Sequence, residues 1–259
     1  MKIDTFGPGD PVVTFVVGVH GDEHAPVEGV EILKDLVTPP ALKKGFRVIT
    51  ANEEALAQGT RFVDCDLNRS FPGLPHGRLE ERLADRLRGE LERTPFVFDF
   101  HTTTFSVPPY AVVSIYSDQV ARVLAAAGVL TAVFDSSESL IKYSARAAAI
   151  ECGFEGDGET ARRAAGIMQR LLWTLDVAGG EREETGPEAL NVLLIYQVIE
   201  QKSFCSLCPS IRDFQLVEKG EVIGTGTDGE EVAASENFYP VWVNHPTHIR
   251  KAKRISIEE

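Results

Sequence analysis

The chain has 259 residues, of which 43% are hydrophobic and 25% charged, as expected for a globular protein with one large core and room for a small second domain. The formal net charge of −13 argues against nucleic acid or an anionic membrane surface as a partner. We expect no membrane span, no signal peptide and, with four cysteines in all, a reducing cytoplasmic location.

Expected strands and helices alternate along the first two thirds of the chain. Apolar runs predict strands at residues 12–19, 46–51, 95–100, 111–116, 129–134 and 147–151. Amphipathic or capped segments predict helices at residues 25–37, 78–93, 117–127 and 160–177. This alternation predicts an α/β fold, with a mostly parallel central sheet flanked by helices.

The pattern changes after a polar linker at residues 181–188. Short apolar stretches separated by turns predict strands at residues 192–200, 211–217, 222–224 and 239–243. We therefore expect a first domain at residues 1–186 and a small β-rich domain at residues 187–259. In the second domain, Cys205 and Cys208 have the spacing of half a zinc knuckle or of a redox pair. No second pair of this kind exists, which favours two unrelated thiols.

Two histidines each end an apolar run. His20 follows residues 12–19, with Glu23 three positions later, and His101 follows residues 95–100. Strands that end in this way can meet at the carboxyl edge of one sheet. His20, Glu23 and His101 would then hold Zn²⁺ with one position open to water, which is the pattern of a catalytic zinc site. The alternative is a solvated turn at a strand end.

A carboxylate at the tip of another apolar run is a candidate general base. Glu151 follows residues 147–150, and a carboxylate in this position is costly unless it faces a cleft. Beside a metal it could take the proton of a bound water, because the metal lowers the pKa of that water. The alternative is an ordinary surface carboxylate.

One polar segment, residues 61–73, closes with Pro-Gly and predicts a long loop, and long ordered loops are usually functional. Its Arg61 and Arg69 offer guanidinium groups to a developing oxyanion and to a substrate carboxylate, and Asn68 can add a donor. The alternative is that both arginines pair with the two aspartates between them.

Five short motifs together resemble one known family. They are His20-Gly-Asp-Glu23, Asn52-Glu-Glu-Ala55, Arg61-Phe-Val-Asp-Cys-Asp-Leu-Asn68-Arg69, Asp99-Phe-His101-Thr-Thr and Ile150-Glu151-Cys-Gly153. This set resembles the aspartoacylase and succinylglutamate desuccinylase family, a branch of the zinc carboxypeptidase superfamily. The resemblance extends over residues 12–244. It implies a carboxypeptidase-like α/β domain at residues 1–186 and a β domain at residues 187–259 that covers the active site.

The resemblance also implies a reaction. The family hydrolyses a small N-acyl amino acid, or a similar amide, to an acid and a free amine, with one Zn²⁺ per chain. The implied roles fall to the zinc ligands His20, Glu23 and His101, the general base Glu151, the carbonyl-polarising Arg61, and the carboxylate-binding pair Asn68 and Arg69.

The chain departs from the aspartoacylase pattern at two substrate contacts. A tyrosine that follows the Val-Asn segment of aspartoacylases is replaced here by His248, with His245 close by, and we place His248 among the substrate-binding residues. A substrate-binding arginine upstream of the catalytic glutamate has no gap-free match, although Lys142 or Arg146 could serve.

Three acids follow the candidate base, where aspartoacylases have a different turn. If Glu155, Asp157 and Glu159 line the mouth of the pocket, they repel a second substrate carboxylate. We then expect a preference for singly charged acyl amino acids. The alternative is that Asp157 caps a helix and that all three acids face solvent.

Three functions are consistent with these residues. The leading one is a zinc-dependent amidohydrolase, in which Glu151 activates a zinc-bound water. A zinc carboxypeptidase acting on short peptides would use the same residues, but a covering β domain should block long substrates. A non-catalytic zinc or metabolite binder is the alternative of another class. The sequence leaves open the acyl group, the amino acid and any homo-oligomer.

Overall fold

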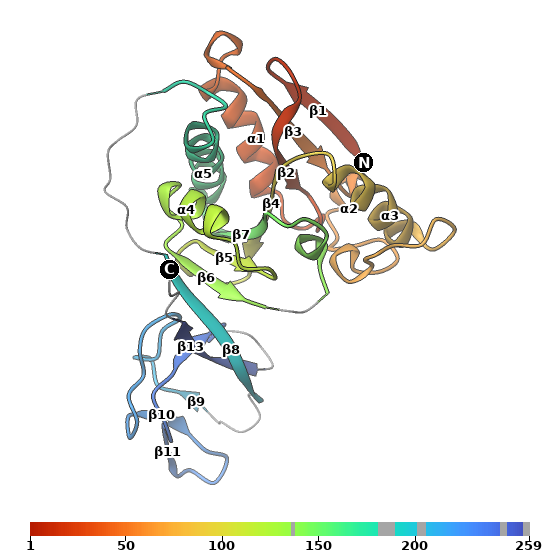
Figure 1. Cartoon of the computed structure of the whole chain (residues 1–259). Coiled ribbons are helices and arrows are strands. Elements are labelled where there is room, and N and C mark those ends of the chain that lie inside the picture. The colour runs from red at the N-terminus through yellow and green to blue at the C-terminus, as the bar shows by residue number, and fades with distance from the viewer. Residues whose placement is uncertain (136–137, 181–189, 201–205, 244–247, 256–259) are drawn as a thin grey trace. The chain divides into compact units, whose positions relative to one another are not determined.

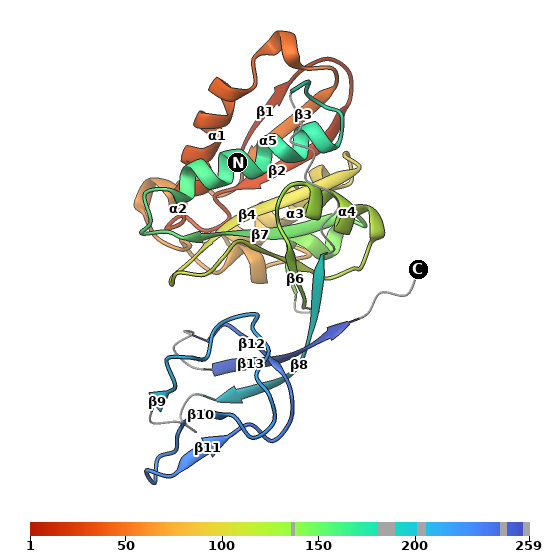
Figure 2. The same cartoon turned by 90° about the vertical axis from the view of Figure 1, so that its left-hand side faces the viewer.

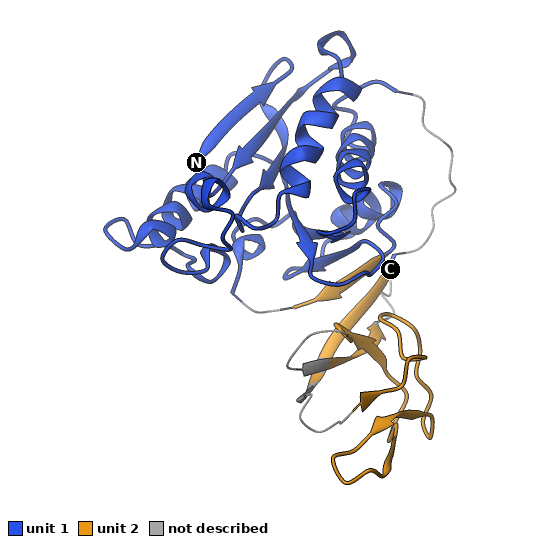
Figure 3. Cartoon of the chain, turned by 180° about the vertical axis from the view of Figure 1, so that it is seen from behind, with its two compact units in different colours: residues 1–130, 136–190 blue, residues 131–135, 191–259 orange. Residues whose placement is uncertain are grey.

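A computed structural model describes residues 1–259 except 136–137, 181–189, 201–205, 244–247 and 256–259. The chain forms two compact units, one of residues 1–130 and 136–190 and the other of residues 131–135 and 191–259 (Figure 3). The predicted domain boundary at residues 186 and 187 lies outside the described residues. No helix in the described part of the chain is long and apolar enough to cross a membrane.

The first unit is built on a mainly parallel sheet. Its strands, in spatial order, are β1 (Lys2–Phe6), β3 (Gly45–Thr50), β2 (Pro11–Val17), β4 (Phe96–Thr103), β7 (Ala147–Phe154) and β5 (Tyr110–Val113). Strand β2 pairs in parallel with β3 and β4, and β4 pairs in parallel with β7. Strands β1 and β5 run antiparallel to their neighbours β3 and β7. The carboxyl ends of β2, β4 and β7 therefore lie at the same edge.

Helices flank this sheet, as the alternating pattern predicts. They are α1 (Ala25–Leu36), α2 (Glu53–Gln58), α3 (Leu79–Leu91), α4 (Asp118–Ala126) and α5 (Thr160–Thr174), with 3-10 turns η1 (Pro39–Ala41), η2 (Leu67–Arg69) and η3 (Leu140–Tyr143). Helices α1 and α5 pack side by side (Figure 1, Figure 2). Helix α3 buries Leu83, Leu87 and Leu91 in one cluster with Val16 and Val97 of the sheet. The predicted α/β fold class is confirmed.

The second unit is β-rich. Strand β6 (Thr131–Phe134) pairs in parallel with β8 (Asn191–Glu200), which is followed across the sheet by β13 (His248–Ile255) and β12 (Tyr239–Val241), both antiparallel. A smaller sheet holds β11 (Glu231–Ala233), β10 (Val222–Thr225) and β9 (Ser206–Leu207). The second unit has an apolar cluster of its own, which includes Ile211, Ile223 and Phe238.

One predicted strand of this unit is wrong, and its strand β13 was not predicted. Residues 211–217 form no strand, because Phe214 adopts a left-handed turn with φ +65, and Val217 makes an isolated bridge to Phe238. Strand β13 was missed because cationic residues interrupt its apolar positions, so its sequence lacks the apolar run by which the other strands were found. The strand β13 is defined by its antiparallel pairing with β8 and β12, which its sequence pattern does not indicate.

Candidate metal centre and active site

The turn after β2 is fixed by two glycines. Gly18 has φ +64, and a Cβ there would lie 2.5 Å from Cδ1 of Leu56. A Cβ on Gly21 would collide with the backbone of Ala55 in α2. Only glycine lets this turn lie against α2. The turn thereby delivers His20 from the carboxyl end of the strand into the protein interior.

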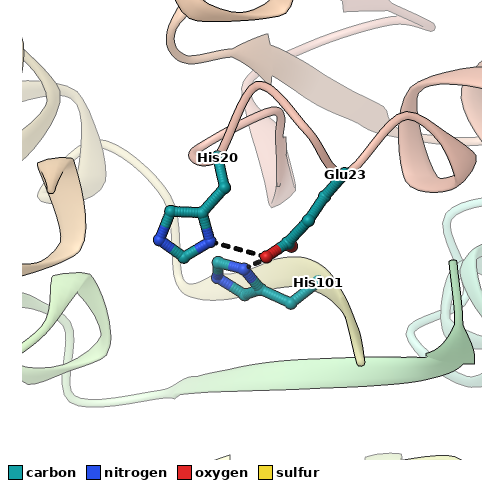
Figure 4. A group of neighbouring side chains, drawn as sticks. All are labelled: His20, Glu23 and His101. Atoms are coloured by element: carbon teal, nitrogen blue, oxygen red, sulfur yellow. Dashed lines mark hydrogen bonds and ion pairs between the residues drawn. The ribbon is translucent and has the colours of Figure 1, made fainter. Parts of the chain in front are cut away.

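Glu23 lies between two imidazoles (Figure 4). Its Oε1 is 2.7 Å from His20 Nδ1, its Oε2 is 2.9 Å from His101 Nδ1, and the backbone N–H of Thr102 donates to Oε2 at 3.1 Å. One ligand atom from each of His20, Glu23 and His101 lies within 4.8 Å of the others, and all three residues are buried. The two strand-end histidines therefore meet, as their positions predict.

A carboxylate holds the far side of each imidazole. His20 Nε2 is 3.3 Å from Asp66 Oδ1, and His101 Nε2 is 2.7 Å from Asp99 Oδ2. These contacts turn both Nδ1 atoms toward Glu23, which is how outer carboxylates orient metal-binding histidines. Two imidazole nitrogens and one carboxylate form a donor set that suits Zn²⁺ with a position left for substrate or water. The residues present therefore fit a catalytic zinc ion.

The charges at this centre favour ionised carboxylates and protonated histidines when no metal is bound. Burial lowers the pKa of His101, but the charges of Asp99 and Glu23 outweigh burial and raise this pKa well above its usual value. Burial raises the pKa of Glu23, but His101 and His20 outweigh burial and lower it. A metal ion must displace protons from this cluster in order to bind.

Glu151 lies on β7, directly across from His101 on β4. The residue as a whole is part-buried, yet its Oε2 is buried and has no hydrogen-bond partner among the described residues. Burial is the largest cause that raises the pKa of Glu151, from an ordinary 4.5 to about 7. A carboxyl group with such a pKa can both accept and return a proton near neutral pH.

Arg61 approaches the same cluster from the polar loop. Its Nη1 lies 3.4 Å from Glu23 Oε1, and its Nε lies 3.4 Å from Asp66 Oδ2. The side chain is 47% exposed, so part of the guanidinium group stays accessible to a ligand. The ion pair with Asp66 that was weighed as an alternative is thus present, together with the approach to Glu23.

Asn68 and Arg69 lie on the turn η2, which Asp66 caps by accepting the Asn68 backbone N–H at 2.9 Å. Asn68 Oδ1 accepts the backbone N–H of Leu140 at 3.0 Å, which turns the amide nitrogen of Asn68 the other way. Arg69 Nη1 donates to the backbone oxygen of Glu138 at 2.5 Å. These contacts tie both residues to the segment around η3.

The remaining candidates in the second unit are described only in part. His248 begins β13, opposite Glu200 in the register, and its predicted contact with substrate remains a prediction. His245 and Cys205 lie outside the described residues, while Cys208 is a part-buried free thiol. The CxxC pair therefore stays a sequence observation.

The three acids after Glu151 make contacts at helix ends. Glu155 Oε1 accepts the backbone N–H groups of His24 and of the next residue, at 2.9 and 3.1 Å, and so caps α1. Asp157 accepts the backbone N–H of Glu159 at 3.0 Å and pairs with Arg163 at 3.1 Å. Asp157 thus contacts the start of α5, as the alternative for this residue has it, but Glu155 is part-buried and does not simply face solvent.

The two candidates for a further cationic contact differ in position. Lys142 Nζ is 3.0 Å from a carboxylate oxygen of Glu138, which neutralises its charge. Arg146 precedes β7, and its guanidinium group lies over the ring of Phe96, 5.6 Å from the centroid. A strand rises about 3.3 Å per residue, so Arg146 is about 16 Å from Glu151. This separation does not favour Arg146 as the further cationic contact, and that role remains a prediction.

Sequence reasoning missed the residues that orient the histidines. The spacing of Asp99 and His101 was a usable signal, because residues two apart on a strand share a face. Asp66 was noticed only as an ion-pair partner of the arginines. Glu80, a wholly buried carboxylate on α3, was not among the candidate residues.

Comparisons with known proteins agree with this geometry. The family model for the succinylglutamate desuccinylase/aspartoacylase catalytic domain matches residues 10–171. Succinylglutamate desuccinylase of Idiomarina loihiensis is 25% identical over 276 residues, covering 92% of this chain and 79% of that protein. The enzyme of the same name from Pseudomonas aeruginosa strain LESB58 is 33% identical over 119 residues, covering 39% of this chain and 35% of the relative's length. The matched segment of this chain thus spans about a third of that relative's length.

Solved structures share the fold. A succinylglutamate desuccinylase/aspartoacylase from Rhodobacter sphaeroides aligns with TM-score 0.76 and 18% identity, covering 98% of this chain and 89% of that one. A mutant form of murine aminoacylase 3 aligns with TM-score 0.68 and 18% identity, covering 96% of each chain. At these identities the structures show the fold alone, whereas the family model covers more than half of the sequence. This chain therefore belongs to the succinylglutamate desuccinylase/aspartoacylase family.

Proposed function

We propose that this protein is a zinc-dependent amidohydrolase that cleaves the amide bond of a small N-acyl amino acid or related amide. The observation that carries the proposal is the convergence of His20, Glu23 and His101 beside Glu151, a carboxyl group with a buried, unpartnered oxygen. Membership of a deacylase family supports the same reaction class. One Zn²⁺ per chain would lower the pKa of a water molecule and polarise the substrate carbonyl.

Glu151 would move the proton. As a carboxylate it accepts a proton from the attacking water, whose oxygen forms the new bond to the carbonyl carbon. The same carboxyl group then gives that proton to the amide nitrogen as the carbon–nitrogen bond breaks, releasing a carboxylic acid and a free amine. The pKa of about 7 suits both directions of transfer.

The loop residues would bind and orient the substrate. Arg61 lies beside Glu23 and is part-exposed, so its guanidinium group can stabilise the negative charge that develops on the carbonyl oxygen. Arg69 and Asn68 are proposed to hold the substrate carboxylate, because a guanidinium group and an amide N–H match its oxygens. In a chain with a net charge of −13, these arginines supply the positive potential that an anionic substrate requires.

The alternatives differ in what they predict for substrates. A carboxypeptidase would use the same residues on a peptide carboxyl end, and the predicted cover by the β domain remains a prediction. A non-catalytic binder would hold zinc without turnover. Glu151 has an oxygen, Oε2, without a hydrogen-bond partner among the described residues, and its pKa is about 7. A carboxyl group of this kind favours catalysis over simple binding.

A substrate panel separates these functions. The zinc-loaded protein is incubated with N-acetyl and N-succinyl amino acids and, separately, with tripeptides, and the released amine is measured. We expect cleavage of acyl amino acids, loss of cleavage in Glu151→Gln, and normal cleavage in Glu159→Gln, whose exposed carboxylate pairs with Arg162. Faster cleavage of the tripeptides would establish a carboxypeptidase, and zinc binding without any turnover would establish a binder.

A further inference from the structure

Helix α3 buries a charged carboxylate against the polar loop. Glu80 has no solvent exposure, and its two oxygens accept four N–H donors. Oε1 accepts Asn52 Nδ2 at 3.1 Å and the backbone N–H of Val63 at 2.7 Å. Oε2 accepts the backbone N–H groups of Asp64 and Cys65, both at 3.1 Å. Three consecutive amides of the loop thus enclose one carboxylate, in the manner of a backbone anion site.

The charge of Glu80 is maintained by these donors. Burial opposes ionisation, but the hydrogen bonds from Val63, Asn52 and the next two loop amides outweigh it and lower the pKa of Glu80. None of the ion pairs in the described part of the chain includes Glu80. Backbone dipoles, rather than a cationic side chain, therefore stabilise the buried charge.

The segment held in this way leads directly into the candidate active site. Cys65 precedes Asp66, which contacts both His20 and Arg61 and caps the turn η2. That turn carries the proposed carboxylate-binding pair Asn68 and Arg69. Every loop residue with a proposed role thus lies within four residues of an amide that Glu80 accepts.

A second connection runs through Asn52 to the turn that carries His20. Asn52 is fully buried, caps α2 by accepting the Ala55 N–H at 3.1 Å, and donates its backbone N–H to the oxygen of Gly18 at 2.9 Å. Gly18 opens the turn that contains His20. Glu80 therefore joins the polar loop to the segment that presents a candidate metal ligand.

We propose that Glu80 is a positioning residue, whose carboxylate holds the 61–69 loop in the one conformation that presents Arg61, Asn68 and Arg69 to substrate. The proposal rests on the substrate-binding role proposed for those residues. Helix α3 is then the rigid support of the substrate loop, although none of its side chains is assigned to contact substrate.

Glutamine cannot replace this carboxylate. It has the same length, but it presents an NH₂ group where Glu80 presents an acceptor to two N–H donors. At least two hydrogen bonds are lost, and buried donors that lose their partners are costly. We expect the loop to leave its native conformation to satisfy those donors, while the core packing of α3 persists.

The test compares Glu80→Gln with Glu90→Gln. Glu90 lies on the same helix, is also largely buried, and pairs with Arg47 at 2.9 Å, but none of its ion pairs or hydrogen bonds in the described part of the chain reaches the loop. Hydrogen exchange is measured on the metal-free proteins, and zinc content, KM and kcat on the loaded ones. We expect exchange of the amides at residues 63–65 to speed up at least about tenfold in Glu80→Gln only, since a lost hydrogen bond of about 1.4 kcal/mol has that effect.

The kinetic expectation is a rise in KM of about tenfold or more for an acyl amino acid, with one zinc retained and Glu90→Gln unchanged. Equal exchange and equal KM in the two variants would overturn the proposal, as would a general destabilisation with no selective change in the loop. If the unaltered enzyme cleaves nothing, the exchange result alone decides on Glu80, and the proposed function fails separately.

The unaltered protein gives a further reading that does not depend on folding of a variant. The amides of Val63, Asp64 and Cys65 lie outside any helix or strand. If Glu80 holds them, they exchange far more slowly than the amides of exposed loops. Exchange as fast as in those loops would contradict the proposal.

Discussion

Replacing Glu151 with glutamine should lower the catalytic rate but raise the stability of the metal-free protein at high pH. Glutamine keeps the shape of the side chain, but it cannot accept a proton from the attacking water. General-base catalysis typically contributes about 100- to 10,000-fold, so kcat should fall by at least about 100-fold while zinc remains bound. The measurement is kcat and zinc content of the two proteins, prepared in parallel.

The stability effect follows from the raised pKa of the same group. A carboxyl group whose pKa rises from 4.5 to about 7 on folding makes the folded protein bind the extra proton between these values, so stability is lost as the pH rises through this interval. The full change corresponds to about 3 kcal/mol, and partial exposure reduces it to about 1–3 kcal/mol. Glutamine carries no such charge, so the metal-free variant should be more stable than the unaltered protein above about pH 7.

Urea unfolding of the metal-free proteins checks this sign. We expect the stability difference between Glu151→Gln and the unaltered protein to grow from about pH 5 to about pH 8. A variant that is inactive but equally destabilised at both pH values would refute the argument that burial of this carboxyl raises its pKa. A variant with near-normal turnover would move the role of the base to another carboxylate.

Three further predictions concern the metal and the substrate. Asp99→Asn should weaken zinc binding about 10- to 100-fold in a chelator competition, because Asp99 orients His101 and increases its basicity; unchanged affinity would show that Asp99 only fills space. Zinc affinity should fall as the pH decreases below the raised pKa values of His20 and His101, since protons then compete for Nδ1; a flat profile between about pH 6 and 8 would contradict the proton displacement. Acyl amino acids with neutral side chains should have a higher kcat/KM than N-acetylaspartate, because Glu138 already neutralises Lys142; a clear preference for N-acetylaspartate would indicate a further cationic contact.

The ligand cluster could be predicted from the sequence because its positions follow from local rules. His20 follows strand β2 and His101 lies near the carboxyl end of β4, and parallel strands bring such ends to one edge. Glu151 lies in the carboxyl-terminal half of β7, the next strand across that sheet, so its approach to His101 follows from the same rule. The fold class was predictable for a similar reason, since strands and helices alternate along the first unit.

The supporting contacts could not be predicted in this way. Glu80 and Cys65 are fifteen residues apart and meet only because α3 packs back on the loop. The spacing of Glu155, Asp157 and Glu159 suggested that the three acids line one surface together. Glu155 instead contacts the start of α1, 131 residues away in the sequence. Such contacts depend on how elements pack, which hydrophobic periodicity does not specify.

Titration of zinc into the metal-free protein, with turnover of an acyl amino acid as the readout, tests the central claim most directly. The account predicts no turnover without metal and a linear rise that reaches its plateau at one zinc per chain. In His101→Ala, where two protein ligands remain, zinc should not be retained and turnover should stay at background. Full turnover in the chelated protein, or one tightly held zinc in His101→Ala, would contradict the assignment of this cluster as the catalytic metal centre.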